Sequence, residues 1–428
     1  MPFKKYLILF TLVLAELLLI TYCRSIFGNI ISPLLLFLIS LSIGIVSIIF
    51  IKESRSFEEN TPVQSFDKQT ALYLLLFLGL SSLFFFIPKS GLLGIYKVFP
   101  INPSVSDVIP AIQVLCKRFV NGEEVYQSIN NFGYQMSPSY LPMIWLPYVP
   151  AEIFHFDYRY TMIFIWILTG ILLISLAIRK DKGFKNGLCV LLLAFYLLSI
   201  VDREPASLGW TPELVSASFY ALLVIGILSK NIYLKALTIA LCMLSRYSIV
   251  LFLPVLFLIE WKENGWGRSI LLAALSTVFS LFILLPLVRH HWMDLYMGYK
   301  HYTISGIAEW RHLDGKGLPW HVLNGNGFAA WMYLIKKGTL EYRFLLMQKI
   351  HLTAIIITVI LLAAFYFLQK TEMDYRWYTV CGIKIYLAVF YSFIQVPYTY
   401  LFLVPVLFSI SMLIMMNKNI HPLKYSDI

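Results

Sequence analysis

The sequence predicts an all-α, polytopic membrane protein with about 12 transmembrane helices and two long outer loops. Hydrophobic residues make up 59% of the 428 residues, and charged residues make up only 13%. Soluble domains are about 45–50% apolar and about 25% charged, so this chain has too little polar surface to cover a soluble globule. Its apolar residues also fall into runs close to the ~20 residues that cross a bilayer as a helix.

Composition and charge exclude several classes of protein: an ordinary cytosolic enzyme, a secreted disulfide scaffold and a disordered chain. The formal net charge is +11. In a membrane protein, an excess of basic residues usually lies in cytoplasmic loops and contacts anionic lipid. The positive charge therefore gives no reason to expect a nucleic-acid partner. The five cysteines are scattered and show no CxxC or Cys/His metal spacing, so we expect no disulfide framework.

The spans follow from the apolar runs. The first run resembles a signal peptide, but it is longer than the usual core of about 7–15 residues, so we expect a retained span. The short segments 232–245 and 247–260 could instead form one long kinked helix. We expect spans near residues 6–23, 31–51, 71–88, 159–178, 187–201, 214–229, 232–245, 247–260, 269–288, 351–369, 377–394 and 398–416.

The distribution of Lys and Arg predicts the orientation. Short loops on the side of the N-terminus carry most of these residues, whereas the short loops of the other side carry Arg24, Arg203 and Arg246. Both termini are therefore expected in the cytoplasm. A bacterial inner membrane is the default location, because no sorting signal points elsewhere.

Two long loops, about 89–158 and 289–350, fall on the outer side, which is periplasmic or luminal. In the first, apolar residues repeat at helical spacing over 108–119, which predicts an interfacial helix. A second apolar stretch, 139–154, holds three prolines and is short for a span, so we expect it to lie in the membrane surface.

Asp107 is the main candidate for chemistry, because it follows a span and precedes the interfacial helix. An acid at this place can take a proton from an acceptor hydroxyl as a general base. The alternative is that Asp107 only caps the helix. Ser106 could cap the helix instead, which would free the Asp107 carboxylate.

The order of features in the first outer loop resembles that of the GT-C superfamily of polytopic membrane glycosyltransferases. Asp107 is followed by a helix, by Gly122-Glu123-Glu124-Val125-Tyr126, and by Tyr140-Leu141-Pro142 with an apolar surface helix. Later stretches are also similar, namely Ser245-Arg246-Tyr247 before a span with Pro254, and Pro397-Tyr398-Thr399-Tyr400 running to Pro405. The superfamily includes protein mannosyltransferases, aminoarabinose transferases and mannosyltransferases of lipid-linked glycans.

The resemblance implies a GT-C-like catalytic domain over residues 71–428, preceded by an N-terminal two-helix addition over 1–70. It implies a polyprenyl-phosphate-linked sugar as donor and a lipid, glycan or protein acceptor, with transfer at the outer membrane face. No cofactor is expected, and a divalent cation is not favoured. The five histidines of the 289–350 region have spacings that match no standard helix-borne metal site.

The leaving phosphate of such a donor needs cations. The candidates are Arg246, Arg289, His290 and Arg311, with His291 and His312 beside them. The alternative roles are a snorkelling helix-end residue for Arg246, a span-end anchor for Arg289 and His290, and a solvated loop residue for Arg311. For the acceptor and the cavity, the candidates are Asp202, Glu204, Tyr126 and Tyr140; Asp202 and Glu204 could also be solvated loop acids.

Two other functions are compatible with the spans. An O-antigen-type polymerase or ligase would also have a large outer loop rich in Arg and His, but it gives no reason for Asp107 and the surface helices after it. A transporter of lipid-linked glycans predicts repeats or ionisable residues within spans. The spans hold mainly Glu16 and Lys384, and no repeat is detectable. A purely structural scaffold does not explain the two outer loops.

Overall fold

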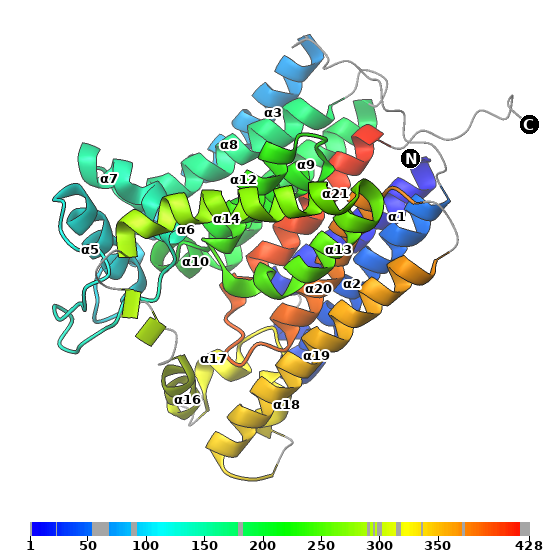
Figure 1. Cartoon of the computed structure of the whole chain (residues 1–428). Coiled ribbons are helices and arrows are strands. Elements are labelled where there is room, and N and C mark those ends of the chain that lie inside the picture. The colour runs from blue at the N-terminus through cyan, green and yellow to red at the C-terminus, as the bar shows by residue number, and fades with distance from the viewer. Residues whose placement is uncertain are drawn as a thin grey trace, which may run out of the picture.

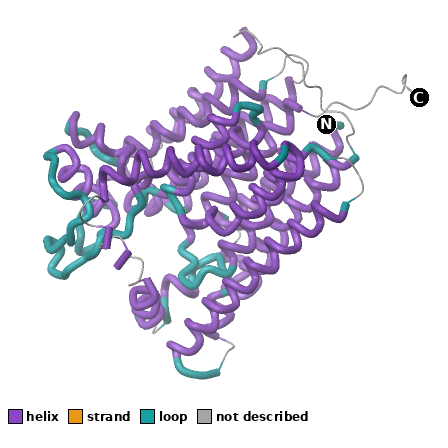
Figure 2. The backbone as a smooth tube through the Cα atoms, viewed as in Figure 1, coloured by secondary structure: helices purple, strands orange, loops and turns teal. Residues whose placement is uncertain are grey.

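The structure, a computed structural model, is all-helical in the part of the chain that it describes. Two isolated β-bridges, Ile129 with Met136 and Leu313 with Pro319, are the β contacts present there. Figure 2 shows helix through most of the molecule, with loops gathered mainly toward its ends. The all-α class is thereby confirmed. The described residues are 2–22, 24–53, 68–86, 92–178, 183–288, 292–293, 296–297, 302–313, 318–334, 337–369 and 373–419.

Six of the described helical segments are long and apolar enough to cross a membrane. A helix of 20 residues is about 30 Å long, which matches the hydrocarbon thickness. They identify a membrane protein, whereas the number of about 12 spans stays a prediction. The six lie in α2 (Arg24–Lys52), α8 (Arg159–Ala177), α9 (Gly183–Arg203), α14 (Trp266–Val288), α19 (Leu340–Leu368), and η3 (Thr399–Phe402) with α21 (Leu403–Asn419).

The other predicted spans are also helical, but these helices are shorter or carry charges. The helices concerned are α1 (Phe3–Thr21), α3 (Lys68–Phe86), α11 (Glu213–Leu228), α12 (Ile232–Met243), η2 (Tyr247–Phe252) with α13 (Leu253–Asn264), and α20 (Tyr375–Ser392). Helix α1, for example, holds three charged residues, Lys4, Lys5 and Glu16.

Residues 232–264 form a hairpin of two short helices. The Lys235 ammonium at the beginning of α12 donates to Glu260 Oε2, at 2.8 Å, near the end of α13. The chain therefore reverses between the two helices, close to Arg246. The alternative of one long kinked helix is wrong.

Contacts between helix ends show which ends lie together on the same side of the bundle. Lys5, at the beginning of α1, forms an ion pair with Glu53, just past the end of α2. At the opposite end of α2, the Ile30 carbonyl accepts a hydrogen bond of 2.8 Å from Trp331, in the second outer loop. Such contacts fit the alternation of spans, while the assignment of one side to the cytoplasm stays a prediction.

The interior of the bundle brings α1 and α2 against α20 and α21. Gly44 of α2 allows a close approach, because a Cβ there would lie 2.4 Å from Ile385 Cγ1. A buried ion pair joins Glu16 to Lys384 across the same contact. The Lys384 ammonium also donates to Ser40 Oγ at 2.7 Å, and the Ser409 hydroxyl donates to Glu16 Oε2 at 2.7 Å.

The first long loop carries the short helices that its sequence predicts. The helix expected after Asp107 is α5 (Val108–Val120), with Ile109, Ile112 and Leu115 buried; the helix is confirmed, and its position at the membrane interface stays a prediction. The proline-rich stretch breaks into three pieces because proline interrupts helices, and none of them is long enough to cross a membrane. These pieces are α6 (Pro142–Trp145), η1 (Leu146–Tyr148) and α7 (Val149–Phe154).

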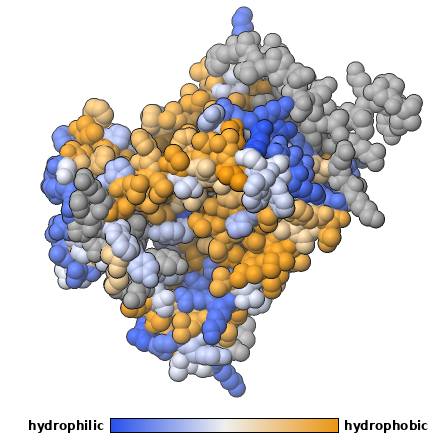
Figure 3. All heavy atoms as spheres, viewed as in Figure 1, coloured by the Kyte–Doolittle hydropathy of each residue, from blue (hydrophilic) through white to orange (hydrophobic). Residues whose placement is uncertain are grey.

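The second outer loop ends earlier than residue 350. Thr339 Oγ1 accepts from the Tyr342 backbone N–H and caps α19, so this helix starts well inside the predicted loop. In Figure 1 the loop helices lie at the end of the bundle opposite the beginning of α1, and Figure 3 shows hydrophobic atoms over much of the long-helix surface between more polar ends. The remaining short helices are α4 (Leu92–Val98), α10 (Pro205–Trp210), α16 (Tyr302–Arg311), α17 (Trp320–Leu323) and α18 (Ala329–Leu334).

Candidate functional site

A cavity of about 790 Å³ lies where both outer loops meet the helical bundle. Its wall combines the end of α1, the beginning of α2, the approach to α5, helix α10, the second outer loop and the segment that leads into α21. Cavities of this size accommodate small-molecule ligands. The polar residues of the wall that matter most here are Ser106, Asp107, Arg203, Glu204, Glu309 and His321.

Asp107 faces this cavity and does not cap α5. It occupies the N-cap position, but its carboxylate accepts no hydrogen bond from the helix backbone. Instead Asp107 Oδ2 accepts a hydrogen bond of 2.6 Å from the Tyr134 hydroxyl. The capping alternative is therefore wrong, and the carboxylate is held by a side chain from the far part of the same loop.

The loop that carries Tyr134 is tied down by its own contacts. The bridge between Ile129 and Met136 closes it at its base, and Gly133 provides the left-handed turn, with φ of 82°. Burial, followed by the hydrogen bond and the charge of Asp107, raises the pKa of Tyr134 to about 12. Tyr134 therefore stays a hydrogen-bond donor to Asp107 throughout the physiological pH range.

The second carboxylate of the wall is Glu204, at the N-cap position of α10. The Thr399 hydroxyl donates to Glu204 Oε2 at 3.1 Å, which links α10 to the segment before α21. The neighbouring Asp202 is not part of the cavity wall; it is exposed and pairs with Arg203, with 3.0 Å between Oδ2 and Nε. The structure thus separates two acids that are close in sequence.

A third carboxylate, Glu309, comes from α16, and sequence reasoning did not single it out. His321 Nε2 lies 3.8 Å from Glu309 Oε2. The His321 ring packs against Tyr398, with 4.9 Å between centroids, and Tyr398 stacks on Tyr400 at 5.0 Å. Burial lowers the pKa of His321, partly opposed by the charge of Glu309, so this imidazole stays neutral over a wider pH range than a free histidine.

Arg246 lies near the cavity but not in its wall. It forms an ion pair with the buried Glu213. Tyr140 lies within electrostatic reach of both Asp107 and Arg246: burial and then the charge of Asp107 raise its pKa, and the charge of Arg246 opposes them. The structure therefore places three of the predicted site residues, Asp107, Tyr140 and Arg246, in one neighbourhood.

The remaining predicted residues lie elsewhere. Tyr126 is buried inside the first loop, where its hydroxyl donates to the Tyr140 carbonyl at 2.9 Å and accepts from Trp145 at 3.1 Å. Arg311 is exposed and pairs with Glu341. Arg289 and His290 lie outside the described residues.

The wall offers carboxylates beside aromatic rings. Trp210 and Trp320 line the cavity together with Tyr398 and Tyr400. The described residues include no group of three or more His, Cys, Asp or Glu side chains placed to hold a metal ion. Acids and rings together suit a ligand that has hydroxyl or ammonium groups and an apolar face.

Comparisons with protein-family models, curated proteins and solved structures found no match for this chain. What it does is therefore inferred from the chemistry of the cavity.

Proposed function

We propose that the protein is a GT-C-like membrane glycosyltransferase. It would move a sugar from a polyprenyl-phosphate donor to a lipid, glycan or protein acceptor at the outer face of the membrane. The observation that carries the proposal is the Asp107 carboxylate, which is not used for capping and faces a cavity of about 790 Å³ at one end of an apolar bundle.

In this proposal Asp107 is the general base. It takes the proton of the acceptor hydroxyl or amine while the acceptor attacks the anomeric carbon of the sugar. The bond from that carbon to the phosphate oxygen breaks, and polyprenyl phosphate leaves. Tyr134 orients the carboxylate through its hydrogen bond, and a positioned base of this kind contributes about 10²–10⁴-fold to the rate.

The leaving phosphate requires positive charge nearby. Arg246 is proposed for this role because it lies near Tyr140 and the cavity, with Glu213 fixing its guanidinium. Arg289 remains a second candidate from sequence. We also propose Arg203 for this role, because the described residues of the cavity wall include no other arginine or lysine.

The sugar would occupy the part of the cavity lined by acids and aromatic rings. Glu204 and Glu309 would accept hydrogen bonds from sugar or acceptor groups, and Trp210 and Trp320 offer faces for the apolar side of the ring. The location follows from the donor, which is too apolar to leave the bilayer. We propose a bacterial inner membrane with both termini in the cytoplasm, which places the cavity on the periplasmic side.

The test is release of polyprenyl phosphate by the purified, detergent-solubilised protein, given a panel of polyprenyl-phosphate sugars and a crude membrane-lipid acceptor. We expect the wild type to release it and Asp107→Asn to be slower by about 10²–10⁴-fold. Glu123→Gln is the matched control, because this exposed acid of the same loop lies outside the cavity wall.

Release that persists in a folded Asp107→Asn protein would remove Asp107 from the reaction and keep the class. No release from any donor would contradict the class. It would favour the polymerase or ligase, which consumes diphosphate-linked oligosaccharides.

A further inference from the structure

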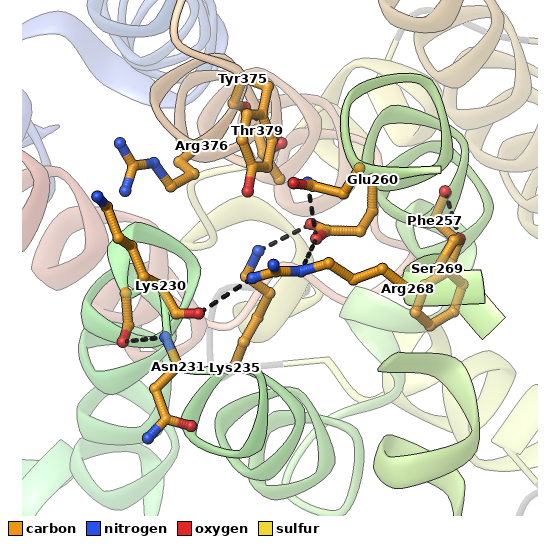
Figure 4. A network of polar contacts seen from close by, with 12 residues as sticks. Lys230, Asn231, Lys235, Phe257, Glu260, Arg268, Ser269, Tyr375, Arg376 and Thr379 are labelled. Atoms are coloured by element: carbon orange, nitrogen blue, oxygen red, sulfur yellow. Dashed lines mark hydrogen bonds and ion pairs between the residues drawn. The ribbon is translucent and has the colours of Figure 1, made fainter. Parts of the chain in front are cut away.

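A second polar cluster lies far from the cavity, where α12 begins, α13 ends and α14 begins (Figure 4). Its centre is Glu260, which is almost fully buried. Lys235 donates to Glu260 Oε2 at 2.8 Å, Asn264 donates to Oε1 at 2.9 Å, and Arg268 Nε lies 3.5 Å from the same Oε1. Two cations therefore share one carboxylate, and the centre of the cluster is positively charged.

Two further basic residues, Lys230 and Arg376, lie beside this centre. The Arg268 guanidinium also donates to the Lys230 carbonyl at 3.1 Å, which brings the Lys230 residue into the cluster. Arg376 pairs with Asp374 at 2.8 Å and acts electrostatically on Lys235. In Figure 4 the side chains of Lys230 and Arg376 extend away from Glu260.

Exposed aromatic side chains of the kind that lie at the level of lipid headgroups surround the cluster. The Arg268 side chain is 41% exposed although its partner Glu260 is buried. Trp266, two residues before Arg268, is 63% exposed, and it packs edge-on against the exposed Trp261. Exposed tryptophan and tyrosine mark the membrane–water interface, and Tyr233 adds a third exposed ring at the beginning of α12.

From this geometry we propose that the cluster binds the headgroup of an anionic phospholipid. The Arg268 guanidinium would contact the phosphate, because arginine binds phosphate through several parallel donors. Trp266 and the exposed apolar residues that follow it on α14 would lie along the acyl chains. Basic pockets between transmembrane helices bind anionic headgroups in this manner. The site is separate from the outer cavity and does not depend on the proposed transferase activity.

The experiment measures binding of phosphatidylglycerol to the full-length protein in detergent. Native mass spectrometry counts the bound lipid, and thermal unfolding follows its effect on the midpoint. We expect phosphatidylglycerol to bind and to raise the midpoint, whereas phosphatidylcholine does not. Arg268→Gln should weaken the affinity by about fivefold, which corresponds to removing one cation near an anionic lipid.

Three controls make the outcome decisive. Arg268→Lys should keep part of the affinity because it keeps the charge, and Lys52→Gln should keep all of it, because it removes a charge at the end of α2 outside the cluster. Inorganic phosphate alone should not raise the midpoint. Equal binding of phosphatidylglycerol and phosphatidylcholine, an unchanged affinity in Arg268→Gln, or equal stabilisation by free phosphate would each overturn the proposal. If Arg268→Gln does not fold, loss of phosphatidylglycerol binding to the wild type at high salt supports it and unchanged binding overturns it.

Discussion

Two regions of the molecule bury or enclose charged side chains in opposite ways. Within the bundle, Glu16 and Lys384 are 1% and 0% exposed and pair with each other. Their remaining hydrogen-bonding capacity is used by Ser40, Ser409 and the Pro405 carbonyl. At the end of the bundle that carries the two long loops, Asp107, Glu204 and Glu309 lie beside a cavity of about 790 Å³. The hydroxyl groups of Tyr134 and Thr399 donate to Asp107 and Glu204.

The difference indicates a structural role for Glu16 and Lys384, and it fits the role in binding or catalysis proposed for the acids of the cavity wall. A charge inside a protein must be paired and hydrogen-bonded, because desolvation otherwise costs several kcal/mol. Glu16 and Lys384 meet this requirement and join α1 to α20. Asp107 and Glu204 accept hydrogen bonds from hydroxyl groups, and all three acids of the cavity wall lie beside space large enough for a ligand.

The largest effect is expected inside the bundle. Lys384→Met would leave Glu16 buried without its cation, so the free energy of unfolding should fall by about 3–5 kcal/mol. Thermal unfolding in detergent measures this loss. The double variant Glu16→Leu with Lys384→Met should recover most of it, because two apolar side chains of similar size leave no unpaired charge. If the double variant were as unstable as Lys384→Met alone, the unpaired charge of Glu16 would not be the cause of the lost stability.

A smaller effect is expected at the cavity. Tyr134→Phe removes the donor to Asp107, and a hydrogen bond to a charged group is worth about 1.5–3 kcal/mol when buried. Tyr134 is 49% exposed, so we expect the lower end, a fall in transfer rate of about tenfold. The unfolding midpoint should fall only slightly, because the half-exposed Tyr134 and the partly exposed Asp107 can exchange this hydrogen bond for bonds to water. A lower midpoint with an unchanged rate would place Tyr134 with the structural residues instead.

The smallest effect is expected in the titration of the Tyr134 hydroxyl. The pKa of Tyr134 is about 12, because burial, the hydrogen bond and the charge of Asp107 all disfavour the phenolate. Since this folded-state pKa lies above the usual value of about 10, the stability it contributes is present below pH 10 and is lost as pH rises through 12.

Asp107→Asn removes the carboxylate charge, so the pKa of Tyr134 should fall toward 10. Absorbance near 295 nm measures it, with Tyr134→Phe subtracted in each background. An unchanged pKa in Asp107→Asn would show that the two groups do not interact.

Much of the fold was predictable because it depends on local patterns. Apolar runs gave the helices, and the helical spacing after Asp107 predicted α5. The hairpin reversal near Arg246 was left open, because length alone does not tell two short helices from one kinked helix; the contact of Lys235 with Glu260 decides it.

The site was predictable only in part. Asp107 has a local signature, since it follows a predicted span and precedes an amphipathic helix. Glu309 and Thr399 reach the cavity through contacts between distant parts of the chain, so their local sequence alone does not place them there. An acid next to a tryptophan in a long outer loop, as at Glu309-Trp310, was the available signal. The partner of Arg246 was equally hidden, because Glu213 begins another helix.

The pairing of Glu16 with Lys384 has a consequence for biosynthesis. The two residues are 368 positions apart in the chain. At about 5–20 residues per second, a ribosome needs roughly 20–70 s to reach Lys384 after it has made Glu16. During that time Glu16 has no Lys384 to pair with, and α1 reaches its final contacts only when both α20 and α21, which carries Ser409, have been inserted.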